Sequence, residues 1–430
     1  MKYKRAYRYR FYPTKEQEAI LACTFGCVRF VYNWALNLCN ETYQAQHRHL
    51  YFTDTSAALT ALKQQPDRLW LNEVSCVPLQ QVLRHLNKAF TNFFEKRSDF
   101  PAFKKKHGPQ SAEYTKSAFS WDGTSIKLAK MNEPLDIHWS RSLPKGCLPS
   151  TVTVSKDTAG RYFISILVEE EVRPLPVLPQ TIGLDLGITS LVALSTGEKV
   201  GNPQFFREDE RKLARAERRK AKKKKGSKNR EKARRKVARI HARIADKRRD
   251  YQQKLTTRIV RENQVICVES LAVKNMMQNR HLAKSIADVG WGELVRQLEY
   301  KAQWYGRALV KIDRWEPTSK KCSVCGHVLD ELDLSIRAWT CPECSASHDR
   351  DINAANNVHA AGVLLLSNYK NDNMPVLDSQ VLHGEYVRTL KVRPPTPSRP
   401  ISNAECIPQP RSSHLAHHPA YTPFLIFQGI

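Results

Sequence analysis

The stretch TIGLDLGITSLVALSTGEKV, residues 181–200, decides the fold, because it places an acid inside an apolar strand pattern. Side chains of a strand alternate between two faces. One face would carry Ile182, Leu184 and Leu186, and the other Gly183, Asp185 and Gly187. The alternation and the later turn residues predict a β-hairpin. A buried carboxylate is unfavourable unless it is paired or binds a metal, so Asp185 is a candidate functional residue.

The segments that follow continue a mixed pattern of helices and strands. A basic block reads as a helix, a break at Gly226-Ser227 and a long second helix. VICVES, residues 265–270, is a short strand that ends at Glu269, and a helix over 292–305 and the strand ALVKID, residues 308–313, come next. A cysteine-rich stretch then interrupts the chain before a final helix over 351–366. This order of elements resembles the RNase H-like fold.

Three acids stand at comparable places in this order. Asp185 lies in a strand, Glu269 ends a strand and Asp351 starts a helix. Three such carboxylates suit two Mg²⁺ ions that straddle a phosphodiester, activate water and stabilise the leaving oxygen. Asp349 or Asp351 could instead be only a helix N-cap, and Glu269 an ordinary acid at a strand end.

Four cysteines have the spacing of a zinc ribbon. Cys322-x2-Cys325 and Cys341-x2-Cys344 are separated by fifteen residues. A closed site of four thiolates has no open position for water, so it would be structural. Two redox dithiols are the rival interpretation, but redox motifs rarely come as matched pairs. His327 and His348 are not needed as ligands, and we expect both to face solvent.

The N-terminal part predicts a second α/β region. Residues 2–12 alternate as a strand. Thr14 to Gln17 form a capping box that opens a helix, and a second strong helix spans 79–94. Short strands between 111 and 170 would form a small β-barrel or a sandwich with the first strand. Three prolines in residues 173–180 mark a linker, and scattered prolines in about the last 60 residues predict a disordered tail.

Charge indicates a polyanionic partner. The formal net charge is +27, and residues 211–249 hold 21 Lys and Arg against 3 Asp and Glu. A single-sign block of this kind is typical of nucleic-acid binding. No membrane segment or signal peptide is recognisable, so we expect a cytoplasmic protein, associated with the bacterial nucleoid, whose other cysteines are reduced.

Several motifs together resemble the RuvC-like nuclease of the TnpB family, the OrfB proteins of bacterial insertion sequences and relatives of type V CRISPR effectors. The motifs are FVYNWAL (30–36), FPAFKKK (100–106), IGLDLGITS (182–190), VICVES (265–270), SIADVGWGELVRQLEYKAQWYG (285–306), the cysteine ribbon and HDRDINAAN (348–356). By motif match Asp185, Glu269 and Asp351 are the catalytic acids. Asp351 is preferred to Asp349 because the family has an Asn two residues later, here Asn353. All three acids are intact, unlike in the inactive repressor branch.

The resemblance implies a multidomain α/β protein. An N-terminal β-barrel (wedge) domain would comprise residues 1–12 and 109–175, with a helical recognition domain inserted at 13–108. The RNase H-like (RuvC) nuclease domain would comprise residues 181–320 and 345–368, with the zinc ribbon inserted at 321–344. Residues 369–430 would be the disordered tail.

The resemblance also implies an activity, cofactors and partners. The chain would be an RNA-guided DNA endonuclease with two catalytic Mg²⁺ ions and a structural Zn²⁺. It would bind a guide RNA from the transposon end and cut double-stranded target DNA beside a short motif, as a monomer, with strand transfer left to a separate transposase. Expected nucleic-acid contacts are Lys104, Lys105, Arg218, Arg219, Lys222, Lys223, Arg234 and Arg235, together with Ser56, Gln80 and Ser120.

Two alternatives belong to other classes. A non-catalytic nucleic-acid-binding regulator of transposition is disfavoured by the intact acids. A transposase that acts directly through an acidic triad shares the RNase H-like fold. The central Glu, the final Asp and the placement of the ribbon speak against it.

Overall fold

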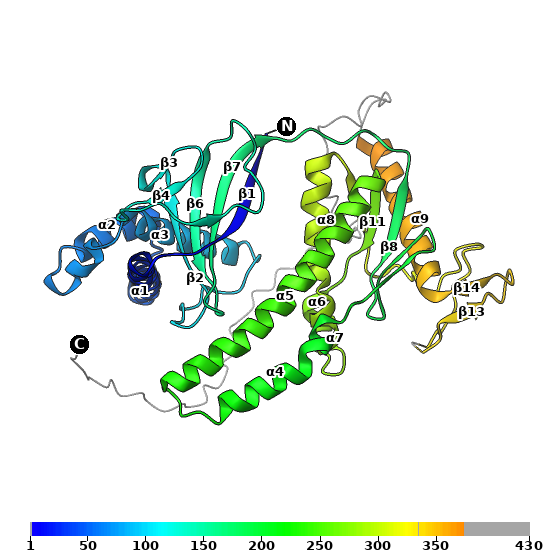
Figure 1. The fold of residues 1–430 in the computed structure, drawn as a ribbon. Helices are drawn as coiled ribbons and strands as arrows, with labels where there is room; N and C mark the ends of the chain where they lie inside the picture. The colour runs from blue at the N-terminus through cyan, green and yellow to red at the C-terminus, as the bar shows by residue number, and fades with distance from the viewer. Residues whose placement is uncertain (1, 334, 374–430) are drawn as a thin grey trace, which may run out of the picture. The chain divides into compact units, whose positions relative to one another are not determined.

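The computed structural model describes residues 2–333 and 335–373, and side chains as far as residue 368. Two five-stranded sheets and two two-stranded ribbons account for the strands in these residues (Figure 1). Apart from the end of the last helix, the expected tail over 369–430 lies outside the described residues.

The first sheet is antiparallel, with the strand order β2-β6-β7-β1-β5. Its strands are β1 (Lys2–Phe11), β2 (Gln110–Thr115), β5 (Ile137–His138), β6 (Pro149–Lys156) and β7 (Tyr162–Glu171). Alternate residues of β1 and β7 are buried, including Tyr9, Phe11, Ile164 and Ile166. Within the described residues the edge strands β2 and β5 do not pair, so this sheet is open, and β3 (Phe119–Trp121) and β4 (Ile126–Leu128) form a separate hairpin. The predicted strands are present without barrel closure.

Helices α1 (Lys15–Gln46), α2 (Phe52–Leu62) and α3 (Cys76–Phe94) lie between β1 and β2 in the chain, with short 3-10 helices η1 (Pro66–Asn72) and η2 (Lys116–Ala118). The capping box is confirmed: the Thr14 hydroxyl accepts a bond from Gln17 N, and the Gln17 side chain accepts one from Thr14 N. By length and composition alone α1 could cross a membrane, which the sequence analysis did not foresee. Its residues Leu21, Val28 and Val31 are buried in the same core as the sheet, which is how a core helix behaves.

The second sheet is mixed, with the order β10-β9-β8-β11-β12. Its strands are β8 (Thr181–Asp185), β9 (Ser190–Leu194), β10 (Lys199–Gly201), β11 (Val265–Glu269) and β12 (Ala308–Ile312). The predicted hairpin is confirmed, since β8 and β9 are antiparallel, and β11 runs parallel to both β8 and β12. Parallel strands β8 and β11 therefore end at the same edge, each with an acid as its last residue.

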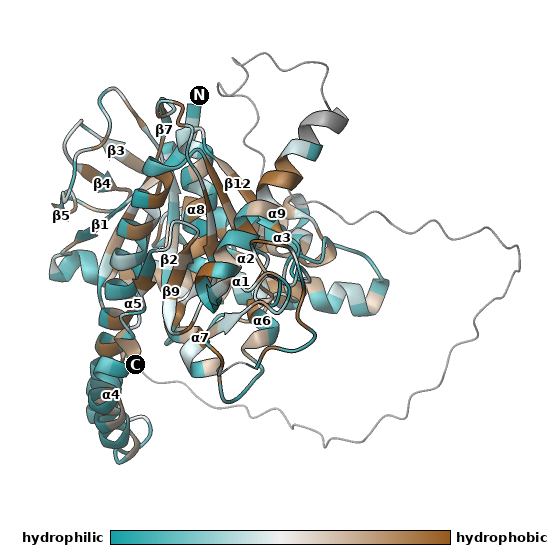
Figure 2. Cartoon of the chain, turned by 90° about the vertical axis from the view of Figure 1, so that its right-hand side faces the viewer, coloured by the Kyte–Doolittle hydropathy of each residue, from teal (hydrophilic) through white to brown (hydrophobic). Residues whose placement is uncertain are grey.

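Helices cover both faces of this sheet. Helices α5 (Lys228–Glu262) and α8 (Trp291–Tyr305) pack on the face that carries Ile182, Leu184, Ile266 and Val268. Helix α9 (Arg350–Asn373) packs on the opposite face, against Cys267 and Val310. The break at Gly226-Ser227 is confirmed, because α4 (Phe205–Ala221) and α5 form a helical hairpin around it, largely hydrophilic along α4 (Figure 2). Short helices α6 (Val273–Met276) and α7 (Ala283–Val289) precede α8.

Helix α9 approaches the sheet so closely that two glycines are required. A Cβ on Gly183 would stand 2.6 Å from His359 N and closer still to the Ala355 carbonyl oxygen. A Cβ on Gly362 would stand 2.6 Å from Cys267 Cβ. The atoms opposite Gly183 belong to a helix backbone and cannot move independently, so strand and helix fix each other's position.

We expect Gly183→Ala to destabilise the protein by about 3 kcal/mol or more, because the methyl group would overlap the α9 backbone. Denaturant unfolding followed by tryptophan fluorescence measures this loss. Gly26→Ala is the matched control: Gly26 lies in α1, nothing lies within 4 Å of the position that an added Cβ would take, and Ala favours helices by up to about 1 kcal/mol. Equal losses in both variants would contradict the close approach.

Candidate active site

The three predicted acids lie at two strand ends and one helix start, near the point where α9 begins. Asp185 and Glu269 are the last residues of β8 and β11, and Asp351 is the second residue of α9. Two-residue spacing places Asp185 on the strand face of Gly183, which is the face that α9 covers. Asp351, Ala355 and His359 recur every four residues on one face of the helix. Since Ala355 and His359 meet Gly183, the preceding turn carries Asp351 toward Asp185.

Burial shifts the pKa values of the two acids at the strand ends. Burial, then the charges of Glu269 and Asp351, raises the pKa of Asp185 to about 8, although Arg350 and Lys199 act in the opposite direction. Burial also raises the pKa of Glu269, and a hydrogen bond from Thr318 partly offsets this. Ionisation of Asp185 in this site is therefore unfavourable, mainly because the group is buried and secondly because two other acids lie near it.

Asp349 and Asp351 have different surroundings. Asp349 Oδ1 accepts hydrogen bonds of 3.1 Å from the backbone N–H groups of Asp351 and Ile352, which is N-cap geometry. Burial raises the pKa of Asp349, but Lys199 and these backbone donors outweigh it, so the pKa is lowered. The N-cap alternative is thus the arrangement found for Asp349, while Asp351 lies near enough to Asp185 for its charge to raise the pKa of that carboxyl group.

Lys199 is a site residue that the sequence analysis missed. Its Nζ lies 2.7 Å from the Asp349 carboxylate and 3.1 Å from Asp351 Oδ2. The sheet register explains this position, because Ala193 pairs with both Asp185 and Lys199, and residues directly opposite share a face. Knowing the hairpin register would have revealed it.

The donor set fits magnesium, which prefers carboxylate oxygens and binds through few of them. The raised pKa of Asp185 is the observation that supports this fit, since a divalent cation beside the buried carboxyl group would favour its ionised form. In the described residues the acids do not converge on one point as the cysteines do, whose ligand atoms all lie within 4.8 Å of one another.

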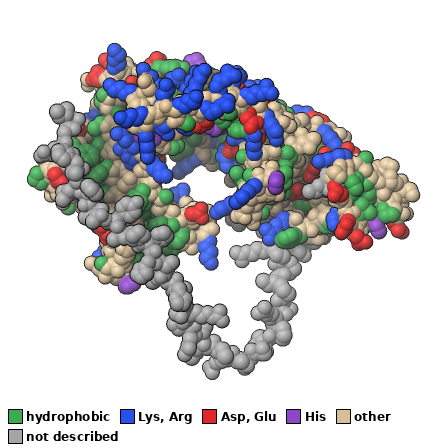
Figure 3. All heavy atoms as spheres, turned by 90° about the horizontal axis from the view of Figure 1, so that it is seen from below, with side chains coloured by type: hydrophobic (Ala, Val, Ile, Leu, Met, Phe, Trp, Pro, Cys, Tyr) green, Lys and Arg blue, Asp and Glu red, His purple; other side chains and the backbone are tan. Residues whose placement is uncertain are grey.

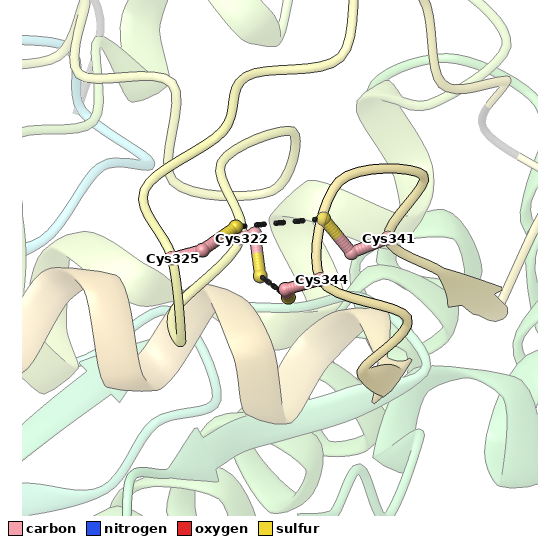
Figure 4. A group of neighbouring side chains, drawn as sticks. All are labelled: Cys322, Cys325, Cys341 and Cys344. Atoms are coloured by element: carbon pink, nitrogen blue, oxygen red, sulfur yellow. Dashed lines mark hydrogen bonds between the residues drawn. The ribbon is translucent and has the colours of Figure 1, made fainter.

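The four cysteines form a compact cluster beside α9 (Figure 4). They come from two loops, with Sγ distances of 3.6 Å between Cys322 and Cys344 and between Cys325 and Cys341. Strands β13 (Ala338–Thr340) and β14 (Ser347–Asp349) pair beside them. Burial raises the pKa of Cys322, but backbone N–H groups and His348 outweigh it and lower the pKa to about 5. Backbone N–H groups act in the same direction on Cys325 and Cys344, but burial and the neighbouring thiols raise the pKa of both, so without a cation the cluster favours one thiolate. The set fits tetrahedral zinc.

The expectation that His348 faces solvent is wrong. The side chain is buried, its Nε2 lies 3.0 Å from Cys322 Sγ, and its ring packs against Trp339 at 4.6 Å. A hydrogen bond to a ligand sulfur orients the ligand rather than replacing it. His327 is partly exposed.

The expected nucleic-acid contacts occupy several elements. Lys and Arg side chains crowd one side of the face in Figure 3. On α4 and the turn after it, Arg218, Arg219, Lys222 and Lys223 are exposed. On α5, Arg235 borders a surface hollow, whose lining residues are Lys232, Arg235, Lys236, Arg239, Ile240 and Arg243. These residues share one helix face, and four of the cations had not been singled out.

The remaining expected contacts differ in accessibility. Arg234 is half-buried and paired with Glu231. The Lys104 ammonium stands 4.3 Å from the Tyr32 ring centre and burial lowers its pKa, whereas Lys105 is exposed. Gln80 and Ser120 are exposed on α3 and β3, and Ser56 is half-buried on α2. The binding roles of all these residues stay predictions.

Relatives of this chain are known by sequence. A protein of Streptomyces pristinaespiralis named "Putative RNA-guided DNA endonuclease" is 55% identical over 361 residues, which cover 84% of this chain and 90% of that protein. The chain belongs to the TnpB (OrfB) family. "Putative RNA-guided DNA endonuclease InsQ" of Escherichia coli K12, another relative, is 33% identical over 385 residues, 85% of this chain and 94% of that protein.

Family models match three parts of the chain. They are described as "Probable transposase" over residues 165–280, "Cas12f1-like, TNB domain" over 291–358 and "Helix-turn-helix domain" over 1–48. A solved structure titled as a Cas12f1–sgRNA–target DNA complex aligns with a TM-score of 0.52, covering 80% of this chain and 83% of that chain at 14% identity. This chain and that Cas12f1 chain thus share a fold.

We expect Asp185→Asn to stabilise the metal-free protein increasingly as pH rises. The unfolded carboxyl ionises near pH 4 and the folded one at about 8, so the wild-type protein loses stability between these values. Asn mimics the neutral form, and the gain at pH 8.5 would reach a few kcal/mol. Thermal unfolding in EDTA at several pH values measures it.

Asp349→Asn is the control for this prediction, because the pKa of Asp349 is lowered and its loss would destabilise at neutral pH. Added Mg²⁺ should stabilise the wild-type protein and not Asp185→Asn. A difference between Asp185→Asn and wild type that stays constant from pH 5 to 8.5 would exclude the raised pKa.

We expect the purified protein to hold about one zinc ion per chain and Cys341→Ser to lose it, because three thiolates bind zinc less well than four. Metal analysis by mass spectrometry measures the content. Cys76→Ser, at an exposed cysteine outside the cluster, should retain full zinc. Equal zinc in both variants would show that the cluster is not the site.

Proposed function

We propose that this chain is a transposon-encoded RNA-guided DNA endonuclease that hydrolyses phosphodiesters with two Mg²⁺ ions. The observation that carries the proposal is the set of three carboxylates at the start of α9, with the pKa of Asp185 raised to about 8 by burial and by the other two acids. The names of relatives at 55% and 33% identity support the same activity.

Asp185, Glu269 and Asp351 would hold the ions. Bound Mg²⁺ would activate a water molecule and stabilise the leaving oxygen of the cut strand. The fold holds Asp185 at the end of a packed strand and Asp351 in the first turn of a packed helix. A hydrogen bond from the Thr318 hydroxyl orients Glu269. Because Asp185 is largely protonated near neutral pH without a cation, metal binding would release its proton.

Guide and target would be bound by the basic surfaces. The one-sided cationic face of α5 and the exposed cations of α4 suit the closely spaced phosphates of a guide–target duplex, and binding would weaken with salt. Base pairing would read the sequence, while the protein reads the backbone and a short adjacent motif.

The proposed domains keep the expected bounds: wedge 1–12 and 109–175, recognition 13–108, nuclease 181–320 and 345–368, and ribbon 321–344. In this proposal the protein works as a monomer in the bacterial cytoplasm, and a separate transposase performs strand transfer. Ser56, Gln80 and Ser120 would contact the motif duplex.

A direct transposase is the second candidate, because the family model over residues 165–280 is described as "Probable transposase". It differs from the first in needing no RNA. RNA dependence of DNA cutting therefore separates the two.

The test is cleavage of a plasmid library by protein expressed with its flanking element DNA, after sequencing of the co-purified RNA. We expect RNA-dependent, Mg²⁺-dependent cutting that Asp185→Ala, Glu269→Ala and Asp351→Ala each reduce about 1,000-fold or more, since each variant removes several kcal/mol of transition-state stabilisation. All three should still bind RNA.

Asp349→Asn should retain more cleavage than Asp351→Asn, because Asp349 is occupied as the N-cap of α9. If the wild-type protein binds RNA but does not cut DNA, the interpretation as a non-catalytic regulator of transposition is favoured. Cutting or strand transfer without RNA would favour the transposase.

A further inference from the structure

The segment from Thr318 to Ser323 joins the active site to the zinc ribbon, and α9 holds it with two buried amides. Asn357 Nδ2 donates to the carbonyl oxygens of Thr318, at 2.8 Å, and Lys321, at 2.6 Å. Asn353 Nδ2 donates to the same Lys321 oxygen at 2.8 Å, and Asn353 Oδ1 accepts from Ser323 N at 2.9 Å. The exposed fractions of Asn353 and Asn357 are only 1% and 5%.

These contacts lead directly into the first zinc knuckle. Lys321 and Ser323 flank Cys322, whose backbone N–H donates to the His327 carbonyl at 2.7 Å. Breaking a buried hydrogen bond leaves an unsatisfied polar group, so this set of bonds resists displacement of the segment. The position of Cys322 and the position of α9 therefore determine each other.

The other end of the segment contacts a proposed metal ligand. Thr318 Oγ1 donates to Glu269 Oε1 at 2.8 Å, and Thr318 is itself 6% exposed. Its carbonyl is fixed by Asn357, so the hydroxyl has little freedom to follow a moving carboxylate. Glu269 Oε1 thereby accepts a hydrogen bond from Thr318, and Oε2 is left to bind a cation.

We propose that Thr318 is a positioning residue for Glu269, and that the zinc ribbon, through Asn353 and Asn357, sets the affinity of the active site for its divalent cation. The proposal rests on the proposed function in taking Glu269 as a metal ligand. Partners of metal ligands typically change metal affinity 10- to 100-fold when they are removed.

The test compares Thr318→Val, which removes the hydroxyl and keeps the shape, with Thr318→Ser, which restores it. Binding of Mn²⁺ to the purified protein–RNA complex is followed by electron paramagnetic resonance, and the Mg²⁺ concentration for half-maximal cleavage is measured in parallel. We expect Thr318→Val to weaken both about 10-fold or more, with cleavage at saturating Mg²⁺ less affected, and Thr318→Ser to approach wild type. Zinc content should be unchanged in both.

Asn353→Ala tests the link to the ribbon, because the hydrogen bonds of the Asn353 amide go to the two residues that flank Cys322, and not to Thr318. It should retain zinc and weaken Mn²⁺ binding in the same direction as Thr318→Val. Thr340→Val is the matched control, since Thr340 is an exposed ribbon residue, and it should leave Mn²⁺ binding unchanged.

If Thr318→Val binds Mn²⁺ as tightly as the wild type does, the proposal is overturned. It is also overturned if Thr318→Ser loses as much Mn²⁺ affinity as Thr318→Val. Mn²⁺ binding is read without cleavage, so failure of the proposed endonuclease activity would be seen separately, as no cutting by any variant while the affinities still differ.

Discussion

The contact of helix α9 with strands β8 and β11 is the constraint on which the site depends. With Gly183 and Gly362 at the interface, helix backbone meets strand backbone, and few other residue types would fit. A slip of one turn would move Asp351 by about 5.4 Å, which is more than the separation of two metals bridged by shared carboxylates. The glycines therefore fix the distance and the register of the acids without touching any ligand.

This packing concentrates negative charge in a strongly basic chain. The formal net charge is +27, yet the pKa of Asp185 is raised to about 8, so distant cations do little for a buried carboxyl group. Lys199 pairs with Asp349 and Asp351 but reaches Asp185 only as a longer-range charge. The two neighbouring aspartates divide their roles, because Asp349 satisfies the helix N-terminus and leaves Asp351 for the cluster.

The sequence predicted local features well and relations between distant segments poorly. Alternation and turn residues were enough for the hairpin and the α4–α5 break, and an acid in IGLDLG is conspicuous without any structure. The choice of Asp351 over Asp349 needed the family motif. With four cysteines available, His348 was not needed as a ligand and was expected to face solvent. Only the fold shows that its ring packs against Trp339 and that its Nε2 lies beside Cys322 Sγ. Finding Lys199 required the strand register. Finding Thr318 and Asn357 required contacts between side chains that are separated by 39 positions (Thr318 and Asn357) and by 49 positions (Glu269 and Thr318) along the chain.

The place of the ribbon in the chain has a mechanical consequence. Asp349 is both the last residue of β14 and the N-cap of α9, so the ribbon hairpin runs into the helix with no loop between them. A two-stranded ribbon is too small to hold its shape by burial, and four thiolates on one ion would supply the stiffness instead. Pairing of Asp349 with Ala338 then fixes the direction in which α9 starts. A ribbon inserted elsewhere in the domain could be equally stable, but it would not orient the turn that carries Asp351.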